Sequence, residues 1–157
     1  MYKIDEDSWN EKYILLIPAM LDAHFPFIKY AFYSKDYHPV ILENEDGITD
    51  VGLKYVNNDM CYPIVLNAGQ MIDALQSGKY DVSKVRLLMP TAGDACRGAN
   101  YLHVLRQAVI NAGFNQTKIL SLNVKGLEKG CQMKLHPYMV WRALFGLFYG
   151  DILMLLL

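Results

Sequence analysis

Four largely apolar runs of five residues each, separated by longer amphipathic segments, constrain the fold of this chain most. The runs are residues 13–17, 38–42, 85–89 and 118–122. Short continuous apolar runs are typical of parallel strands that are covered by helices on both faces. Their alternation with helical segments predicts an α/β domain with a mainly parallel sheet of about four strands. Its type would be a Rossmann-like or flavodoxin-like three-layer domain.

Five other segments have the spacing of helices. We expect helices over residues 22–34, 48–55, 63–77, 101–111 and from 136 to near the end of the chain. Pro26 and Pro63 suit the first turn of two of them, because the N–H that proline lacks has no helical partner there. Gly113 suits the end of a third, because glycine readily adopts the left-handed conformation that closes helices.

Size, charge and cysteine content narrow the class of protein. The 157 residues predict one domain, 1–157, and 53% hydrophobic residues indicate much buried or partner-covered surface. A net charge of −1 predicts no nucleic-acid partner and no attraction to a membrane surface. The first ten residues carry four charged side chains and do not look like a secretory leader. Three cysteines, an odd number, favour the cytoplasm over a disulfide-bonded exterior.

The last twenty residues, 138–157, are strongly apolar and are interrupted by Arg142 and Asp151. A membrane-spanning helix is one interpretation, but we expect a buried helix instead. Apolar side chains fall on all sides of this helix, so something must cover it. We expect a larger protein or a second copy of the chain to do so, which would make a homo-oligomer.

Two cysteines share one sequence arrangement. Cys61 and Cys96 each lie two residues after an aspartate, Asp59 and Asp94, and each precedes an amphipathic helix. If the aspartates are N-caps, each sulfur lies in a first helical turn, where backbone N–H groups favour a thiolate. Arg97 would add positive charge beside Cys96. Both loops belong at the carboxyl edge of a parallel sheet, where ligands bind in such folds.

The spacing alone leaves other interpretations open. Each thiol could be a buried, inert small hydrophobe, as free cysteines often are. The spacing fixes no third ligand, and we assign no ligand role to Cys131, which lies in a loop rich in glycine and lysine. The sequence contains no glycine fingerprint for a nucleotide and no paired histidine motif.

Several longer blocks resemble a known family. They are GLKYVNNDMCYP (52–63), GQMIDAL with GKYD (69–75 and 78–81), TAGDACRGANY (91–101), and ILSLN with GLE (119–123 and 126–128). They resemble the region that follows the ATPase part of proteins called 2-hydroxyacyl-CoA dehydratase activase-related, or CoA-substrate-specific enzyme activase. That region is itself similar to dehydratase subunits that carry a [4Fe-4S] cluster.

The resemblance implies a cytoplasmic, oxygen-sensitive iron–sulfur domain from anaerobic metabolism. In the related dehydratases the cluster receives an electron and supports the removal of water from a 2-hydroxyacyl-CoA. Cys61 and Cys96 match the cysteine positions of the family and would be cluster ligands. Asp59, Asp94, Arg97 and Asn100 would surround the cluster or contact an acyl-CoA substrate.

Two thiols are fewer than a cluster usually needs. The remaining ligands would come from the rest of a larger activase-related protein, from a second subunit or from a non-protein ligand. Whether the chain is itself a lyase stays open, and ATP hydrolysis is not expected because the ATPase region is absent. The alternatives are a non-catalytic Rossmann-like docking or scaffold module and a thiol redox sensor.

Overall fold

The computed structural model describes residues 12–20, 22–89, 100–121, 133 and 136–156. Its centre is one parallel sheet with strand order β2-β1-β3-β4. The strands are β1 (Tyr13–Ile17), β2 (Tyr37–Ile41), β3 (Val85–Met89) and β4 (Lys118–Ser121). In the register, Leu16 of β1 lies between Val40 of β2 and Leu87 of β3. The expected α/β class with a mainly parallel sheet is confirmed.

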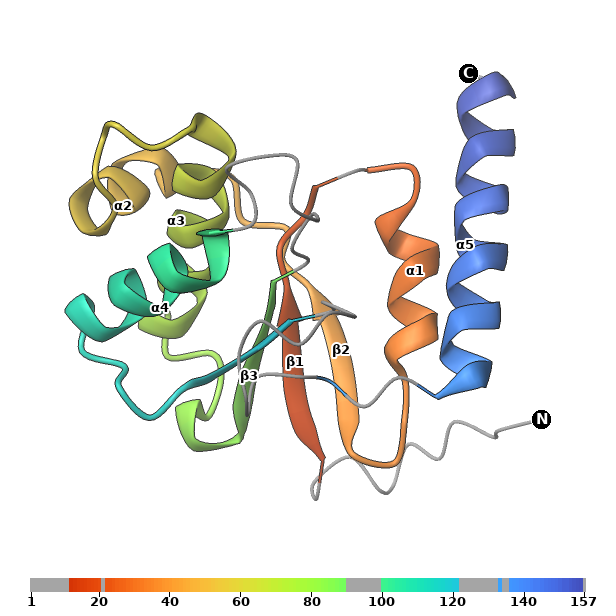
Figure 1. Cartoon of the computed structure of the whole chain (residues 1–157), viewed down its shortest axis with the longest axis horizontal. Helices are drawn as coiled ribbons and strands as arrows, with labels where there is room; N and C mark the ends of the chain where they lie inside the picture. Colours follow the sequence, from red (N-terminus) through yellow and green to blue (C-terminus); the bar gives the residue numbers. More distant parts are fainter. Residues whose placement is uncertain (1–11, 21, 90–99, 122–132, 134–135, 157) are drawn as a thin grey trace.

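Helices cover both faces of this sheet, which makes three layers (Figure 1). On one face lie α2 (Ile48–Tyr55), α3 (Tyr62–Gln76) and α4 (Tyr101–Asn111). On the other face lies α1 (Phe25–Phe32), and α5 (Pro137–Leu156) stands outside α1. A short 3-10 helix, η2 (Val82–Lys84), leads into β3.

Helix α1 is shorter than the expected 22–34, and Ser34 accounts for its end. The Ser34 hydroxyl accepts hydrogen bonds from the N–H groups of Asp36 and Tyr37 at 3.3 and 3.2 Å. Tyr33 is already extended, with ψ of 118°. The chain therefore turns at Ser34 and enters β2 directly.

Two glycines bring α2 and α3 into backbone contact. A Cβ atom on Gly52 would lie 2.1 Å from the carbonyl oxygen of Val65, and one on Gly69 would lie 1.8 Å from the carbonyl oxygen of Ile48. Only glycine permits this approach, since main-chain atoms cannot move aside as a flexible side chain can. The result is a rigid pair of helices over the largest apolar cluster, which includes the fully buried Ile64 and Met71.

Helix α5 differs from the expectation that it is buried. Of its twenty residues only Met139, Gly146 and Gly150 are buried. Large apolar side chains such as Trp141, Phe148 and Leu155 are 64%, 65% and 86% exposed. By length and composition α5 could cross a membrane, since its mean hydropathy is 1.5, and 17% of that stretch is buried. The expectation of a buried helix is wrong for this chain because α5 contacts the fold along one narrow stripe.

Candidate functional site

The order of the strands defines one edge of the sheet as the ligand-binding edge. Strand β2 lies on one side of β1 and β3 lies on the other, so the order in which successive strands are added to the sheet reverses between β1 and β3. Loops that leave the carboxyl ends of such neighbouring strands diverge and leave a crevice. The segment after β1 and the segment after β3 both begin at this edge, which we call the switch edge.

Cys61 lies beside the switch edge at the start of α3. It is the N-cap residue of that helix, with φ −66° and ψ 144°, and it is half-buried. Its Sγ atom lies 2.6 Å from the hydroxyl oxygen of Tyr101, and either group could be the donor. Tyr101 is the first residue of α4 and is 8% exposed. One thiol–hydroxyl contact therefore joins the N-termini of two helices on the same face of the sheet.

The hypothesis that Asp59 is the N-cap of α3 is wrong. The helix begins at Tyr62 and its N-cap is Cys61. The reason is a turn before the helix: the Asp59 N–H donates to Oδ1 of Asn57 at 3.1 Å, and the Met60 N–H donates to the Asn57 carbonyl at 3.1 Å. The Cys61 sulfur therefore lies at the cap position and not inside the first turn.

The other expected site residues divide into two groups. Asn100 is the N-cap residue of α4, is exposed and makes no side-chain cap hydrogen bond. Cys96, Asp94 and Arg97 lie outside the described residues, as does Cys131. A role of Asp59 or Asn100 near a ligand stays a prediction.

Tyr101 is the residue of the site to which the sequence analysis gave no role. Its ring does pack in the core, yet its hydroxyl contacts the thiol. Its position as first residue of the helix that follows the Cys96 loop could have signalled this contact.

Among the described residues, no group of three or more His, Cys, Asp or Glu side chains could hold a metal ion. They supply one thiol, Cys61. A protein-bound iron–sulfur cluster is normally held by several thiolates. The described side chains therefore do not form a complete cluster site, and no reaction step can be derived through a cluster.

A hydrogen-bonded network pins α3 to the loops after β1 and β2. The Gln70 side chain accepts from the Ala19 N–H at 2.9 Å and donates to the carbonyl oxygens of Leu42 and Asn44 at 3.2 and 2.9 Å. The Asn44 amide donates in turn to the Gln70 carbonyl and to a carboxylate oxygen of Asp73, the latter at 2.7 Å. Gln70 is 4% exposed, so its polar atoms are buried and all engaged. This network separates two cavities.

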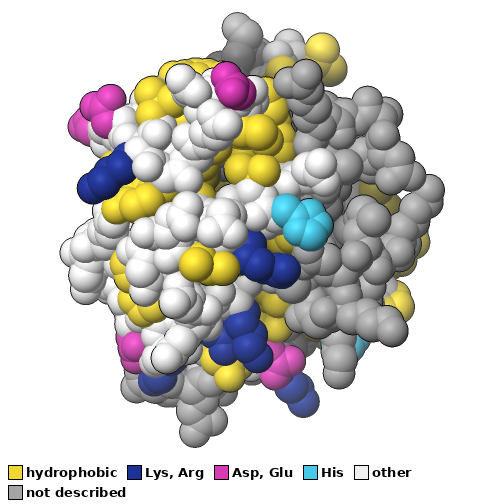
Figure 2. Space-filling view, turned by 60° about the vertical axis from the view of Figure 1, so that its left-hand side comes forward, with side chains coloured by type: hydrophobic (Ala, Val, Ile, Leu, Met, Phe, Trp, Pro, Cys, Tyr) yellow, Lys and Arg dark blue, Asp and Glu magenta, His cyan; other side chains and the backbone are white. Residues whose placement is uncertain are grey.

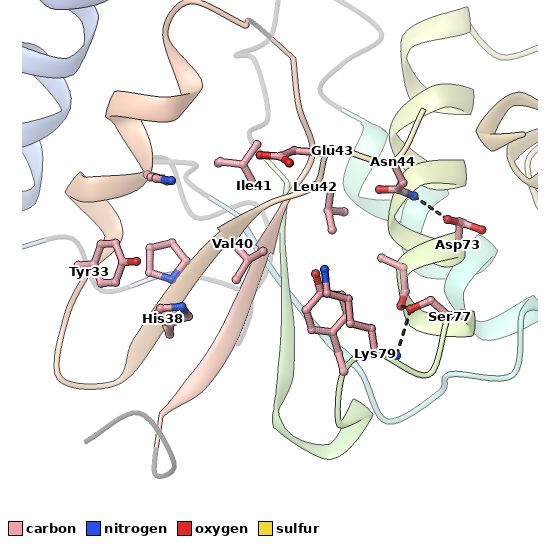
Figure 3. A pocket seen from close by; sticks show the side chains of 14 residues that line it. Tyr33, His38, Val40, Ile41, Leu42, Glu43, Asn44, Asp73, Ser77 and Lys79 are labelled. Carbon is pink, nitrogen blue, oxygen red and sulfur yellow. Dashed lines mark hydrogen bonds between the residues drawn. The ribbon is translucent and has the colours of Figure 1, made fainter. Parts of the chain in front are cut away.

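The first cavity, of about 400 Å³, runs along β2, which is an edge strand of the sheet (Figure 3). Lys29 of α1 and the C-cap residue Tyr33 line it on one side, and the end of α3 with the turn after it supplies Asp73, Ser77 and Lys79. Burial, together with the positive charges of Lys12 and Lys29, lowers the pKa of His38 in this wall. His38 is therefore held toward its neutral form.

The strand edge in this cavity offers few free backbone groups. Because the Leu42 N–H donates to Ile17 of β1, alternation along the strand turns the backbone of residues 37, 39 and 41 away from β1. The N–H and carbonyl of Tyr37 are both hydrogen-bonded to Ser34. Pro39 has no N–H. The groove is thus poorly suited to a peptide that adds as a strand.

The second cavity, of about 470 Å³, lies on the other side of the network, where Ala19 follows β1. Helix α3 contributes Tyr62, Asn67 and Gln70 to its wall, and the segment before α2 contributes Glu45. This volume lies in the range of small-molecule sites.

Charge on the helical face seen in Figure 2 is mixed. Acidic and basic side chains are scattered among apolar ones, and the described surface in this view shows no single-sign patch. A broad electrostatic surface for a polyanion is therefore not a feature of this face.

Comparisons with protein-family models, with curated proteins and with solved structures found no match for this chain. The family resemblance therefore rests on the sequence blocks alone.

Proposed function

We propose that this chain is an iron–sulfur lobe related to 2-hydroxyacyl-CoA dehydratases, with its site at the switch edge and Cys61 and Cys96 as ligands. The observation that supports it is the 2.6 Å contact between Cys61 and Tyr101. Cys96 precedes Tyr101 by five residues, a stretch that spans at most about 18 Å even when extended. The contact thus limits how far apart the two cysteines can lie.

The helix ends favour negative charge at the same place. Both α3, with 15 residues, and α4, with 11, begin beside the Cys61–Tyr101 contact. Free N–H groups and the positive ends of helix dipoles stabilise thiolates and other anions. When bound, a cluster would supply one-electron chemistry to the dehydration of an acyl-CoA thioester. The chain itself would hold the thiolates and exclude water with the buried Tyr101 ring.

The remaining cluster ligands would come from the rest of a larger activase-related protein, from a second subunit or from a non-protein ligand. The cytoplasmic location belongs to the same proposal, since the cluster and free thiols require reducing conditions. No ATPase activity is proposed for this chain.

The test is the metal content of protein purified without oxygen. We expect iron, acid-labile sulfide and the visible absorption of an iron–sulfur cluster, and we expect all three to be lost in Cys61→Ser and in Cys96→Ser. Cys131→Ser is the matched control and should retain them. Colourless, iron-free protein after cluster reconstitution contradicts the proposal, and a cluster that survives both substitutions contradicts the choice of ligands.

Tyr101→Phe examines the contact itself, because it removes only the hydroxyl. We expect the variant to retain iron but to bleach faster in air, since the hydroxyl no longer hydrogen-bonds the sulfur. Unchanged bleaching would show that the contact does not support the site.

One observation favours a second function, a docking or scaffold module: the apolar side of α5 is exposed. In that case purified protein is iron-free and self-associates, and the molar mass measured by light scattering should fall to that of the monomer in Phe148→Lys. Leu53→Lys, at a 47% exposed position on α2, is the control and should leave the oligomer intact. Iron-containing protein that stays monomeric excludes this alternative.

A further inference from the structure

Helix α5 carries one continuous apolar stripe on its exposed side. Its side chains are spaced alternately four and three residues apart: Trp141, Phe145, Phe148, Ile152 and Leu155. Their exposed fractions run from 53% to 86%. This spacing is the heptad pattern by which one helix packs along another. We call these five residues the outer stripe.

The outer stripe faces away from the rest of the fold. Met139, Gly146 and Gly150 are the buried residues of α5 and mark the side that packs on the fold. At about 3.6 residues per turn, the outer stripe lies on the opposite side of the helix. Helix α5 stands at the margin of the molecule, outside α1 (Figure 1). The charged residues of α5, Arg142 and Asp151, lie on the two flanks of the stripe and do not interrupt it.

The exposed apolar surface is large enough for a stable dimer. An aromatic side chain presents roughly 150–250 Å² when fully open, so the outer stripe with Leu144 and Tyr149 beside it exposes about 800 Å². Each partner of a standard protein–protein interface contributes about 800 Å². Monomeric soluble proteins rarely leave an apolar patch of this size open.

The order of residues along the stripe is self-complementary when two copies run antiparallel. A two-fold axis between residues 146 and 147 places Trp141 opposite Ile152 of a second copy, and Phe145 opposite Phe148. The largest side chain then faces a smaller one, and the two helix dipoles oppose each other, which is favourable. A parallel pair would instead set Trp141, Phe145 and Phe148 each against its own copy.

We propose that the outer stripe is the interface of an antiparallel two-fold dimer of this chain, in which α5 of each copy packs along α5 of the other. The proposal rests on the docking function given above as the alternative, for which it supplies the partner and the geometry. It requires no iron. Because the stripe pairs with itself, the contact closes at two copies.

A lipid bilayer is the other apolar partner for a helix of this length and composition. Two features favour the second copy. Helix α5 is held against α1 by the close approach of Gly146 to Ile28, which a spanning helix would give up. Arg142 and Asp151 would also enter the hydrocarbon, since twenty residues cover about 30 Å, the thickness of its core.

Paired charge substitutions test the geometry by size exclusion with light scattering. The unmodified chain should have the molar mass of a dimer. Phe145→Lys and Phe148→Asp should each be monomeric, because each places unpaired charges in an apolar interface. Mixed in equal amounts, the two variants should recover the dimer, since the introduced lysine faces the introduced aspartate and the other Phe145–Phe148 contact is kept.

The matched control mixture is Phe145→Lys with Phe145→Asp, which contains the same charges but pairs them only in a parallel dimer. This mixture should stay monomeric, and recovery here but not in the first mixture overturns the antiparallel geometry. Circular dichroism checks folding. If a variant does not fold, Trp141→Lys with Ile152→Asp replaces the first mixture, because the same two-fold axis pairs these positions.

The outcomes separate this inference from the docking function. A dimer that is lost in the single variants and not recovered in the first mixture overturns the antiparallel interface, while self-association stands. An unmodified chain that is monomeric contradicts self-association itself, and a monomer that floats with phosphatidylcholine vesicles shows that a bilayer covers the stripe instead. An oligomer larger than two copies overturns the closed pair.

Discussion

The two helical layers use the same packing device with different results. Glycines bring α2 against α3, and glycines bring α5 against α1: Cβ atoms on Gly146 and Gly150 would approach Ile28 of α1 and its N-cap residue His24 to 3.2 and 2.3 Å. Yet α3 buries ten of its fifteen residues, whereas α5 buries three of twenty. Close approach fixes how two helices meet, but burial on the remaining sides decides whether a helix belongs to the core. Helix α3 is therefore integral to the fold, and α5 is attached to it.

The layers also differ in their polar contacts. The Gln70 network ties α3 to two loops through one buried and two partly buried hydrogen bonds. The α1–α5 layer has the pair between the buried His24 Nε2 and Asp151 Oδ1 at 3.0 Å, and Asp151 is 65% exposed. Solvent around the Asp151 carboxylate screens this pair, so its contribution to stability is small. Substitutions in the two layers should therefore differ in magnitude.

Gly69→Ala should have the largest effect. The added methyl group would meet the Ile48 carbonyl at 1.8 Å, and main chain cannot yield without separating α2 from α3. We expect a loss of about 3 kcal/mol in the free energy of unfolding, measured in urea. Gly146→Ala is the control in the other layer, where the nearest atoms lie at 3.2–3.4 Å. Similar losses in the two variants would contradict the difference between the layers.

Gln70→Leu should come next, with a loss of about 2 kcal/mol, because three backbone groups that are buried or partly buried lose their partner. Asn67→Leu on the same helix should change stability by less than about 0.5 kcal/mol, or increase it, since it removes a buried donor that was already unpaired. Chemical denaturation of the two variants side by side measures both. A large loss at Asn67 would show that its amide has a structural function.

Gly150→Ala should have a smaller and local effect. The methyl group would contact the His24 ring at 2.3 Å, and that ring can shift where a main-chain atom cannot. We expect a loss of about 1 kcal/mol and faster amide hydrogen exchange in α5, with α3 unchanged. Exchange that accelerates equally in both helices would show that α5 and α3 unfold as one unit.

The smallest effect concerns pH. Burial, with Lys12 and Lys29, lowers the pKa of His38 below its ordinary 6.5. The unfolded chain therefore takes up this proton first, and stability that is full above about pH 6.5 declines as the pH falls toward the lower folded-state pKa. His38→Gln should lose less stability than the unmodified chain between pH 7.5 and 5.5 in thermal unfolding. Parallel curves for the two proteins would contradict a lowered pKa.

Much of the fold follows from the sequence because strands and helices have simple periodicities. Residues 13–17 and 85–89 are strands and residues 48–55 and 101–111 are helices, each as expected. The expected positions of Pro63 and Gly113 are also confirmed: Pro63 lies in the first turn of α3, and Gly113 follows α4 with φ of 93°. These features depend on neighbours in the chain, which a sequence displays.

Features that depend on distant neighbours were missed. An apolar pattern predicted that α5 needs a cover but could not show that Gly146 and Gly150 would meet α1 on one stripe. Gln70 has hydrogen-bond partners and Asn67 Nδ2 has none because of which loops reach α3. The periodicity of the sequence does not predict where those loops lie. The sequence predicted that Cys61 lies at the carboxyl edge of the sheet, but it did not predict the contact of Cys61 with Tyr101, 40 residues away.

The outer edge of β2 has a consequence for aggregation. Exposed strand edges are templates on which copies of a protein polymerise, and proline is one way in which proteins prevent this. Here Pro39 interrupts the row of donors, and Ser34 occupies both backbone groups of Tyr37. Pro39 and Ser34 therefore hinder copies of this chain from pairing along β2 into a continuous intermolecular sheet.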